Sequence, residues 1–251
     1  MTFIGIIPAR YASTRFPAKP LAILGGLTVI ERVYRQVEGV LDNAVVATDD
    51  QRIYDTVEAF GGKVVMTSVH HKSGTDRVWE AYERIGEEYD VVVNIQGDEP
   101  FIQPSQLQTI QHCFEKNSQT EIATLVKPFT YQDGIDALEN PNSPKVVVDD
   151  TCRALYFSRS VIPYLRGVDR SEWLSTHTFY KHIGLYAYRP EVLRDITSLP
   201  QSPLEIAESL EQLRWLQAGF HIQVGISQIE TIGIDTPEDL LKAEEYLKLK
   251  K

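Results

Sequence analysis

Apolar runs and segments with helical periodicity alternate along the first half of the chain. The runs FIGIIPA, AVVATDD, KVVM and DVVVNIQGDEP have the β-branched, apolar composition of buried strands. Between them, apolar residues recur at helical spacing, as Ile30, Val33, Tyr34 and Val37 do. Strands that alternate with helices of this length form a parallel sheet with right-handed crossovers and helices on both faces. We therefore predict a doubly wound, mostly parallel α/β fold.

The alternation ends near Thr130. Two short strands are expected in DALENPNSPKVVVDDTCRALYFSRSVIPYLRG and another in YKHIGLYAYRP, so we predict an antiparallel insertion at about 130–190. The segment SPLEIAESLEQLRWLQAG predicts one helix ending at Gly219, and HIQVGISQ a strand. IDTPEDLLKAEEYL predicts a last helix with Thr236 as N-cap and Pro237 at its first position. Because no linker is recognisable, we predict a single domain over 1–251.

Composition and charge exclude several classes of protein. A net charge of −10 argues against a nucleic-acid-binding surface, which needs a basic face. No apolar run approaches the length of a membrane span, and the N-terminus lacks the pattern of a signal peptide. Cys113 and Cys152 belong to no CxxC or Cys/His cluster, which is consistent with reduced thiols. We expect a cytoplasmic protein without membrane insertion.

Three cations nevertheless gather in IIPARYASTRFPAKPL, directly after the first predicted strand. Arg10, Arg15 and Lys19, with Ser13 and Thr14, offer donors to an anion, while the prolines stiffen the loop. Neither a GxGxxG fingerprint nor a GxxxxGK[ST] motif is present, which disfavours dinucleotide binding and Walker-type NTPases. The loop predicts a polyphosphate site built mainly from side chains. The alternative is a solvated loop whose cations pair with surface carboxylates.

Acidic residues follow two later apolar runs. Asp98 comes after VVVNIQG, where Gly97 permits close approach of the backbone, and Asp235 follows TIGI and precedes the last helix. Carboxylates at strand ends can hold Mg²⁺, which usually shares its coordination with substrate phosphates. A turn carboxylate at Asp98 and a helix-capping one at Asp235 are the alternatives.

Eight motifs in order give the chain a specific family resemblance. They are IIPARYASTRFPAKPL, VATDD, SGTDR, VNIQGDEP, ALYFSR, KHIGLYAYR, PLEIAESLEQLR and IDTPEDL, and they run from Ile6 to Leu240. Together they resemble the 3-deoxy-manno-octulosonate (Kdo) cytidylyltransferases, or CMP-Kdo synthetases, which have the Rossmann-like nucleotide-diphospho-sugar transferase fold. The resemblance implies that the anomeric hydroxyl of Kdo attacks the α-phosphorus of CTP, giving CMP-Kdo and pyrophosphate with Mg²⁺, for lipopolysaccharide synthesis. It also implies a homodimer, whose interface we would place in the insertion.

The same resemblance assigns roles to individual residues. As catalytic residues it implies Lys19, Arg10, Asp98 and Asp235, of which Asp98 and Asp235 would hold Mg²⁺. For CTP binding it implies Ala9, Arg10, Ser13, Arg15, Lys19, Ser73, Gly74 and Arg77. For Kdo binding it implies Gln96, Arg159, His182, Tyr186, Glu211 and Gln212.

Simpler interpretations exist for several of these residues. Arg77 alone is typical of an ion pair on a helix surface, a lone histidine in a strand of a structural residue, and Glu211 with Gln212 of a solvated helix face. His177 and His182 also suggest a general base, which we do not favour because metal activation suffices.

The chain departs from the usual family pattern at two positions of the first loop, and functions other than Kdo activation are also considered. The family usually has Leu and Gly where this chain has Phe16 and Ala18, so we expect an ordinary φ at Ala18. Alternatives to Kdo activation are activation of its 8-amino analogue or a nonulosonate, and a sugar-nucleotide sensor without catalysis. The presence of Lys19, Asp98 and Asp235 favours an enzyme.

Overall fold

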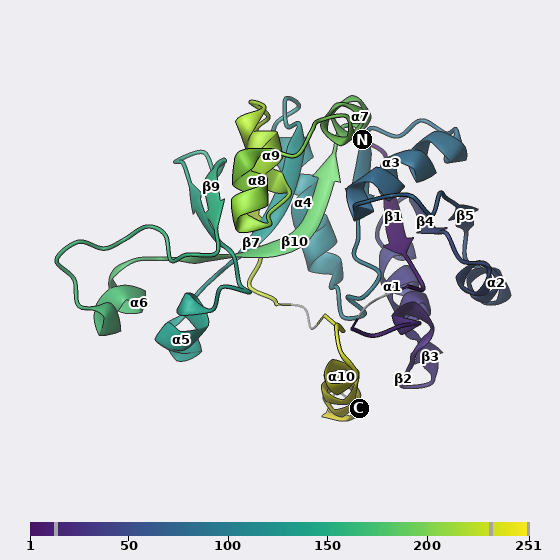
Figure 1. Cartoon of the computed structure of the whole chain (residues 1–251), viewed down its shortest axis with the longest axis horizontal. Helices are drawn as coiled ribbons and strands as arrows, with labels where there is room; N and C mark the ends of the chain where they lie inside the picture. Colours follow the sequence, from purple (N-terminus) through teal and green to yellow (C-terminus); the bar gives the residue numbers. More distant parts are fainter. Residues whose placement is uncertain (13–14, 231–232, 250–251) are drawn as a thin grey trace. The chain divides into compact units, whose positions relative to one another are not determined.

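The computed structural model describes residues 1–12, 15–230 and 233–249 (Figure 1). The chain divides into two compact units, each assembled from separate stretches of sequence. Unit 1 comprises Met1–Gln108, Ala187–Thr197 and Thr231–Lys251, and unit 2 comprises Thr109–Tyr186 and Ser198–Glu230. The boundary falls within helix α4 (Pro104–Lys116) and within strand β10 (Tyr180–Tyr188).

Unit 1 is built around a parallel sheet with strand order β6-β1-β4-β5. Its strands are β1 (Phe3–Ala9), β4 (Asn43–Thr48), β5 (Val64–Met66) and β6 (Val91–Asn94). Ile4, Ile6 and Ile7 of the central strand β1 are fully buried, which explains why its run is apolar on both faces. The predicted parallel α/β arrangement with flanking helices is confirmed.

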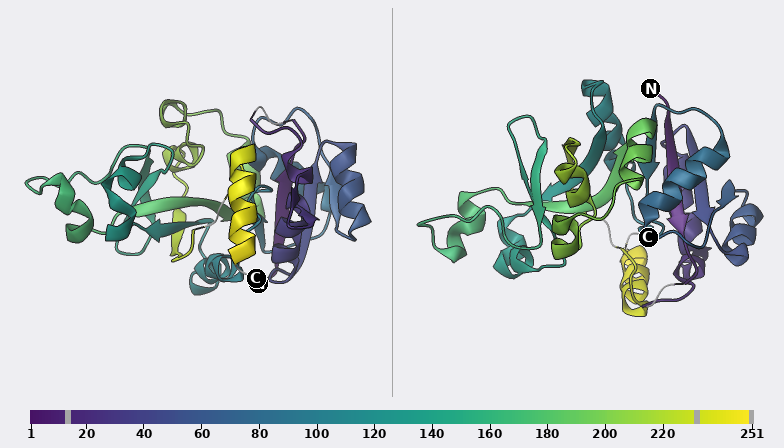
Figure 2. Two further views of the ribbon diagram at one scale, coloured as in Figure 1. Left: turned by 90° about the horizontal axis from the view of Figure 1, so that it is seen from below. Right: turned by 45° about the horizontal axis from the view of Figure 1, so that its top comes forward.

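Helix starts in unit 1 follow the capping residues of the sequence. Thr28 Oγ1 accepts a hydrogen bond from Glu31 N at 3.2 Å, and Thr236 Oγ1 accepts one from Asp239 N at 3.2 Å, as the N-cap signals predict. The other elements of unit 1 are η1 (Lys19–Leu21), β2 (Ile23–Leu24), β3 (Leu27–Thr28), α1 (Val29–Glu38), α2 (Gln51–Ala59), α3 (Gly74–Ile85), α7 (Pro190–Thr197) and α10 (Pro237–Leu249). Helix α10 packs against the β2–β3 hairpin through a cluster around Leu24. In both views of Figure 2 the yellow helix α10 lies beside the purple N-terminal elements.

Unit 2 carries the antiparallel pairs predicted after Thr130. Strand β8 (Lys145–Val148) pairs antiparallel with β9 (Ala154–Ser158) and with β10, while β11 (Ile222–Ile226) pairs parallel with β7 (Ile122–Pro128). Its remaining elements are η2 (Tyr131–Asp133), α5 (Gly134–Glu139), η3 (Arg170–Glu172), α6 (Trp173–Thr176), α8 (Pro203–Glu208) and α9 (Gln212–Gln217).

The prediction of a single helix over SPLEIAESLEQLRWLQAG is wrong. The segment forms two short helices, α8 and α9, because Ser209 adopts a left-handed conformation with φ 50° and ψ 49°. Apolar periodicity continues across the break, so the sequence gives no sign of it. The break leaves the carbonyl oxygens of Glu208 and Ser209 outside a helical ladder, and the Arg159 side chain donates to both. Within the described ranges, no helix has the length and apolarity to cross a membrane.

Candidate active site

The cationic loop begins where β1 ends, at the buried Ala9. Arg10 is exposed, and the Arg15 side chain is 67% exposed, whereas that of Lys19 is only 12% exposed. Ser13, the other phosphate-binding residue predicted here, lies outside the described residues. The described cations therefore differ: two arginines face solvent, and one lysine is enclosed.

The expectation of an ordinary φ at Ala18 is wrong. Ala18 has φ 60° and ψ 16°, in the left-handed region that favours glycine. Its N–H donates to Tyr11 O at 3.0 Å and its carbonyl accepts from Leu21 N at 2.8 Å, so the turn into η1 depends on this conformation. The loop keeps the backbone geometry of a glycine-bearing turn at a cost in strain.

Lys19 joins two carboxylates that are distant in sequence. Its Nζ lies 2.5 Å from Asp98 Oδ2 and 3.1 Å from Asp235 Oδ1, and Arg15 lies 3.1 Å from the other oxygen of Asp235. The two acids predicted as metal ligands thus meet at one ammonium group, beside two of the cations predicted to bind phosphate. We call Arg15, Lys19, Asp98 and Asp235 the lysine–carboxylate cluster.

Close backbone contacts hold this cluster together. At Gly97 a Cβ atom would lie 2.8 Å from Pro8 O, so only glycine lets the turn before Asp98 approach the end of β1. Ile234 N donates to Asp98 O at 2.9 Å, which fixes Asp235 beside that turn. The expected strand before Asp235 is not present in its described residues 233–234, so this hydrogen bond, rather than a sheet register, positions the second acid.

The donor set of the cluster suits a hard divalent cation. Asp98 and Asp235 present carboxylate oxygens near a common point, with side chains 25% and 48% exposed. Among the described residues no group of three or more His, Cys, Asp or Glu side chains gathers. Two carboxylates completed by substrate phosphates and water match the way proteins usually bind Mg²⁺.

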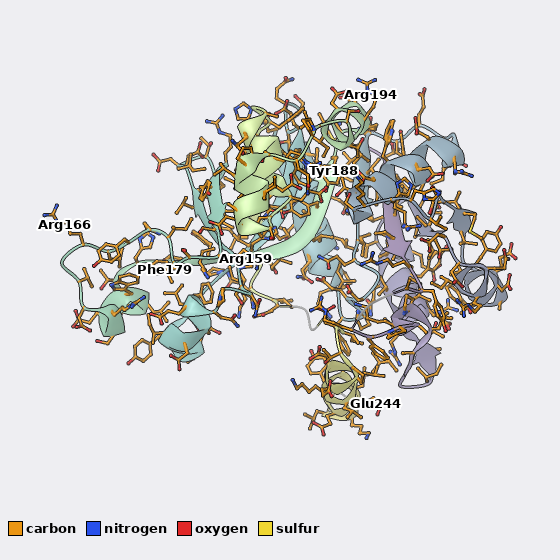
Figure 3. The ribbon with its side chains drawn as sticks, in the orientation of Figure 1. Arg159, Arg166, Phe179, Tyr188, Arg194 and Glu244 are labelled. Carbon is orange, nitrogen blue, oxygen red and sulfur yellow. The ribbon has the colours of Figure 1, made fainter. Side chains whose placement is uncertain are left out.

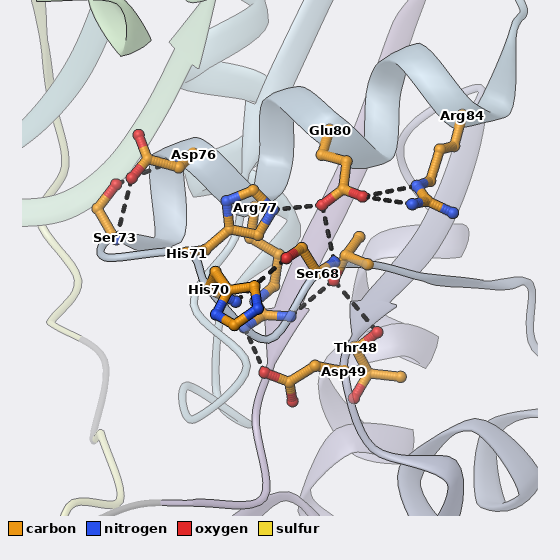
Figure 4. A network of polar contacts seen from close by, with 11 residues as sticks. Thr48, Asp49, Ser68, His70, His71, Ser73, Asp76, Arg77, Glu80 and Arg84 are labelled. Carbon is orange, nitrogen blue, oxygen red and sulfur yellow. Dashed lines mark hydrogen bonds and ion pairs between the residues drawn. The ribbon is translucent and has the colours of Figure 1, made fainter.

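The predicted nucleotide-binding segment SGTDR forms the first turn of α3 (Figure 4). Ser73 Oγ accepts from Asp76 N at 3.1 Å, and Asp76 Oδ2 accepts from Ser73 N at 3.2 Å, which is a capping box. Gly74 lies beside Pro8 of β1, since a Cβ there would be 3.7 Å from the Pro8 ring. The segment is therefore fixed near the carboxyl end of the central strand.

Arg77 forms a buried ion pair instead of the helix-surface pair considered from the sequence. Its guanidinium donates to Asp49 Oδ2 and to Thr67 Oγ1, each at 2.6 Å, and the side chain is 5% exposed. These bonds tie α3 to the ends of β4 and β5. The sequence offered a signal for the partner: Asp49 lies in VATDD, which follows a strand as QGDEP does.

Glu80, one turn further along α3, holds the loop that precedes Ser73 (Figure 4). Its carboxylate accepts from Ser68 N at 2.8 Å, contacts His71 Nε2, and pairs with Arg84 at 2.6 Å. Desolvation alone would raise the pKa of Glu80, but these hydrogen bonds outweigh it and lower the pKa to about 2. His71 therefore helps to anchor the loop.

The residues predicted to bind the sugar fall into both units. Gln96 is exposed in unit 1, and the other five belong to unit 2. Arg159, labelled in Figure 3, directly follows β9. Its guanidinium donates to three main-chain carbonyls: Glu208 O at 2.6 Å, Pro141 O at 2.9 Å and Ser209 O at 3.1 Å.

His182 and Tyr186 lie side by side on β10, with ring centroids 5.3 Å apart. His182 Nε2 is 3.0 Å from Thr124 Oγ1, and its ring packs edge-on against Phe157. Desolvation by burial lowers the pKa of His182 to about 3, so the ring is neutral near pH 7. A base this weak is poorly suited to accept a proton, which supports the choice against a general base here.

Glu211 and Gln212 lie where α9 begins. Glu211 Oε1 accepts from Arg214 at 2.7 Å, whereas Gln212 is 4% exposed and its Nε2 has no hydrogen-bond partner among the described residues. The simpler interpretation of these two residues as a solvated helix face does not hold for Gln212. A buried amide without an acceptor is costly unless a ligand oxygen supplies one.

Comparison with known proteins agrees with this geometry. The family model described as Cytidylyltransferase matches residues 4–230. A 3-deoxy-manno-octulosonate cytidylyltransferase of Phocaeicola vulgatus is 71% identical over 248 residues, which cover 99% of this chain and 98% of the relative. The chain belongs to the 3-deoxy-manno-octulosonate cytidylyltransferase family. The resemblance predicted from eight motifs is confirmed.

Further members of the family extend the match in sequence and in structure. The 3-deoxy-manno-octulosonate cytidylyltransferase of Bacteroides thetaiotaomicron is 69% identical, covering 99% of each chain. A solved structure of CMP:2-keto-3-deoxy-manno-octonic acid synthetase complexed with CTP is 38% identical, covers 100% of both chains and has a TM-score of 0.91. The fold class predicted from strand and helix alternation is that of this family.

Proposed function

We propose that this chain transfers CMP from CTP to the anomeric hydroxyl of Kdo, with release of pyrophosphate. The observation that carries the proposal is the lysine–carboxylate cluster, because it gathers phosphate-binding cations and two candidate metal ligands after the central strand. The 71% identical relative, named as a Kdo cytidylyltransferase over its full length, supports the choice of substrate. A sugar-nucleotide sensor would not need both acids.

The cations of the first loop bind the triphosphate in this proposal. Lys19 has three N–H donors, and the two carboxylates accept two of them, which leaves one for a phosphate oxygen. Arg10 and Arg15 are exposed and can grip phosphate oxygens in pairs. The base and ribose would bind at the end of β1, which is lined by Ala9, Ser73 and Gly74. The family resemblance also assigns Ser13 to the phosphate site.

The Asp98 and Asp235 carboxylates would hold Mg²⁺. When bound, the ion would neutralise phosphate charge and lower the pKa of the attacking hydroxyl. The protein's own part is positional: its cations orient the triphosphate so that the sugar oxygen approaches the α-phosphorus in line with the departing pyrophosphate. A bond forms from that oxygen to phosphorus, the bond to the β-phosphate oxygen breaks, and the hydroxyl proton passes to solvent.

Kdo would be recognised by Gln96, Arg159, His182, Tyr186, Glu211 and Gln212. The guanidinium of Arg159 suits the sugar carboxylate, and the buried Gln212 amide suits a sugar oxygen. Glu211 accepts hydrogen bonds and so suits hydroxyl groups. Arg77, whose guanidinium binds Asp49 and Thr67, acts in this proposal by fixing α3 rather than by direct charge on CTP.

The experiment is a pyrophosphate-release assay with CTP, Mg²⁺ and a panel of acidic sugars. We expect release with Kdo and much less with 8-amino-Kdo or a nonulosonate. Release with one of those sugars but not with Kdo would overturn the substrate. If no sugar of the panel led to pyrophosphate release but the protein bound CMP-Kdo, the result would favour the sensor.

We also propose that the protein is a homodimer in the cytoplasm and that residues 130–190 form the interface. Large apolar side chains in this stretch are exposed in the single chain, including Tyr131 at 70%, Leu155 at 61% and Tyr164 at 76%. Light scattering should give twice the chain mass, and Leu155→Arg should shift it toward the monomer. A monomeric wild type would contradict the proposal.

A further inference from the structure

Lys145 is a lysine that none of the roles above uses. It is the first residue of β8 and is fully buried, with 0% exposure. Burying an ammonium group is expensive unless it is well hydrogen-bonded. Its Nζ donates to Arg159 O at 2.7 Å and to Asn140 O at 3.1 Å, so its two acceptors are main-chain carbonyls rather than carboxylates.

These two bonds fix the surroundings of Arg159 from two sides. One holds the backbone of Arg159 itself. The other holds Asn140, the neighbour of Pro141, whose carbonyl accepts from the Arg159 guanidinium. Because Lys145 also pairs with Ser158 in the β8–β9 register, it ties the end of β9 to the turn after α5.

Glu208 completes the arrangement from the other side. Its carboxylate accepts from Arg159 N at 2.9 Å and from Ser158 Oγ at 2.7 Å, so it binds the backbone of Arg159 and leaves the guanidinium to carbonyl oxygens. Among the described residues, no carboxylate pairs with that guanidinium. Lys145, Arg159 and Glu208 together carry two positive charges and one negative charge.

Burial lowers the pKa of the Lys145 ammonium group. The neighbouring Glu208 carboxylate raises it and the Arg159 guanidinium lowers it, so the pKa lies below its ordinary value. Nothing in the sequence marks this burial, because a lysine at the start of the short strand KVVV is typical of an exposed strand end.

We infer that Lys145 is a positioning residue that holds Arg159 ready for the carboxylate of the sugar, and that the surplus positive charge of this pair selects an acidic sugar. The inference rests on the proposed function, since it names the group that Arg159 recognises. Carbonyl acceptors orient the guanidinium without neutralising it, so its charge stays available to an incoming anion. Lys145 acts through Arg159 and touches no reacting atom.

The test compares wild type with Lys145→Met, which keeps the length of the side chain and removes its charge and donors. We expect the KM for Kdo to rise about tenfold, the cost of a lost charge-assisted interaction, while kcat and the KM for CTP stay within about twofold. The preference for Kdo over its methyl ester should fall in the variant. Lys127→Met is the matched control, because Lys127 is a partly buried lysine of unit 2 that pairs with Asp133 and Glu230.

A double-mutant cycle separates positioning from mere stability. If Lys145 acts through Arg159, adding Lys145→Met to Arg159→Gln should raise the KM for Kdo by less than about twofold. The inference would be overturned if the two substitutions raised the KM for Kdo by the product of their separate effects. It would also be overturned if Lys145→Met raised the KM values for Kdo and CTP equally. Should Lys145→Met fail to fold, Lys145→Gln, which retains a donor for the carbonyls and lacks the charge, is measured against the same criteria.

Calorimetric titration with Kdo distinguishes this inference from the proposed function. Weaker binding to Lys145→Met than to wild type, without pyrophosphate release by either, would support the inference and refute the proposed reaction. Equal binding, with release by wild type, would refute the inference alone. No binding of Kdo or of any other acidic sugar by wild type would refute both.

Discussion

The lysine–carboxylate cluster of unit 1 and the surroundings of Arg159 in unit 2 treat positive charge in opposite ways. Lys19 points at two carboxylates, whereas the Arg159 guanidinium points at three main-chain carbonyls. In the first region charge is balanced by side chains, and in the second it is oriented but not balanced. The two arrangements suit different ligands.

A cluster whose positive and negative side chains neutralise one another can exchange these partners for the charged groups of a ligand. A polyphosphate with its cation brings both signs of charge, so phosphate oxygens can take the lysine while the carboxylates take the metal. A sugar acid brings one negative charge and no counter-ion, so it needs a cation without a carboxylate partner. The contrast is therefore what a protein that binds both CTP and an acidic sugar requires.

The largest expected effect comes from Asp98→Asn, which removes a charge from the first region. We expect kcat to fall at least about 100-fold, because a ligand of the metal and a partner of Lys19 are lost together. The melting temperature should change little, since the side chain is partly exposed. Pyrophosphate release at several Mg²⁺ concentrations measures the effect.

Asp195→Asn is the matched control for this change. Asp195 is an exposed carboxylate paired with Arg194, outside the cluster. Near-normal rates for Asp98→Asn at limiting Mg²⁺ would show that Asp98 is not a metal ligand.

A smaller and more selective effect is expected from Arg159→Ala in the second region. The KM for Kdo should rise about 10- to 100-fold, corresponding to one charge-assisted contact, with the KM for CTP within about threefold. Steady-state kinetics with each substrate varied in turn measures both. If CTP and Kdo lose affinity equally, Arg159 does not belong to the sugar site and the contrast between the two regions fails.

The partly buried His182 of the second region predicts a pH effect on stability. The pKa of His182 is about 3 in the folded chain and about 6.5 when unfolded, so the unfolded state takes up the proton first as pH falls. Stability is therefore lost from about pH 6.5 downward, by an amount on the order of 2 kcal/mol at pH 5.

Urea unfolding at pH 7 and pH 5 tests this prediction. The loss between the two values should shrink in His182→Gln and persist in His221→Gln, whose histidine is exposed in the wild type. An unchanged loss in His182→Gln would mean that His182 is not the group responsible.

The strands, the capped helices and the family could be predicted because each rests on local pattern. The N-cap residues Thr28 and Thr236 and the apolar runs determine the backbone conformation of their own segments. The family motifs can be recognised without any knowledge of tertiary contacts. The pairing of Asp98 and Asp235 with Lys19 was not expected, but the proximity of the two acids was, since acids after apolar runs gather near strand ends. Its actual cause, the hydrogen bond from Ile234 N to Asp98 O, is a tertiary contact that no local pattern records.

The errors occurred where tertiary contacts overrule local preference. Ser209 interrupts a continuous helical pattern with a left-handed conformation, and the carbonyls at the break bind Arg159. Lys145 is buried although lysine at a strand end is normally exposed. Ala18 takes a left-handed conformation that an alanine disfavours. In each case the conformation or burial of the residue depends on contacts with a part of the chain distant in sequence, or on a turn that the residue type does not predict.

The smallest expected effect is a gain in stability from Ala18→Gly, which tests whether strain in the first region serves the site. Left-handed alanine costs about 1 to 2 kcal/mol, and glycine removes this cost while adding entropy to the unfolded chain, so the free energy of unfolding should rise by up to about 1 kcal/mol. Chemical denaturation measures it, with Ala22→Gly as the control, because Ala22 has φ −60° and should only lose stability. If the turn simply tolerates alanine, kcat will stay within about twofold. A fall in kcat despite greater stability would mean that the alanine stiffens the loop that presents Lys19, and a loss of stability equal to that of Ala22→Gly would show that Ala18 is not strained.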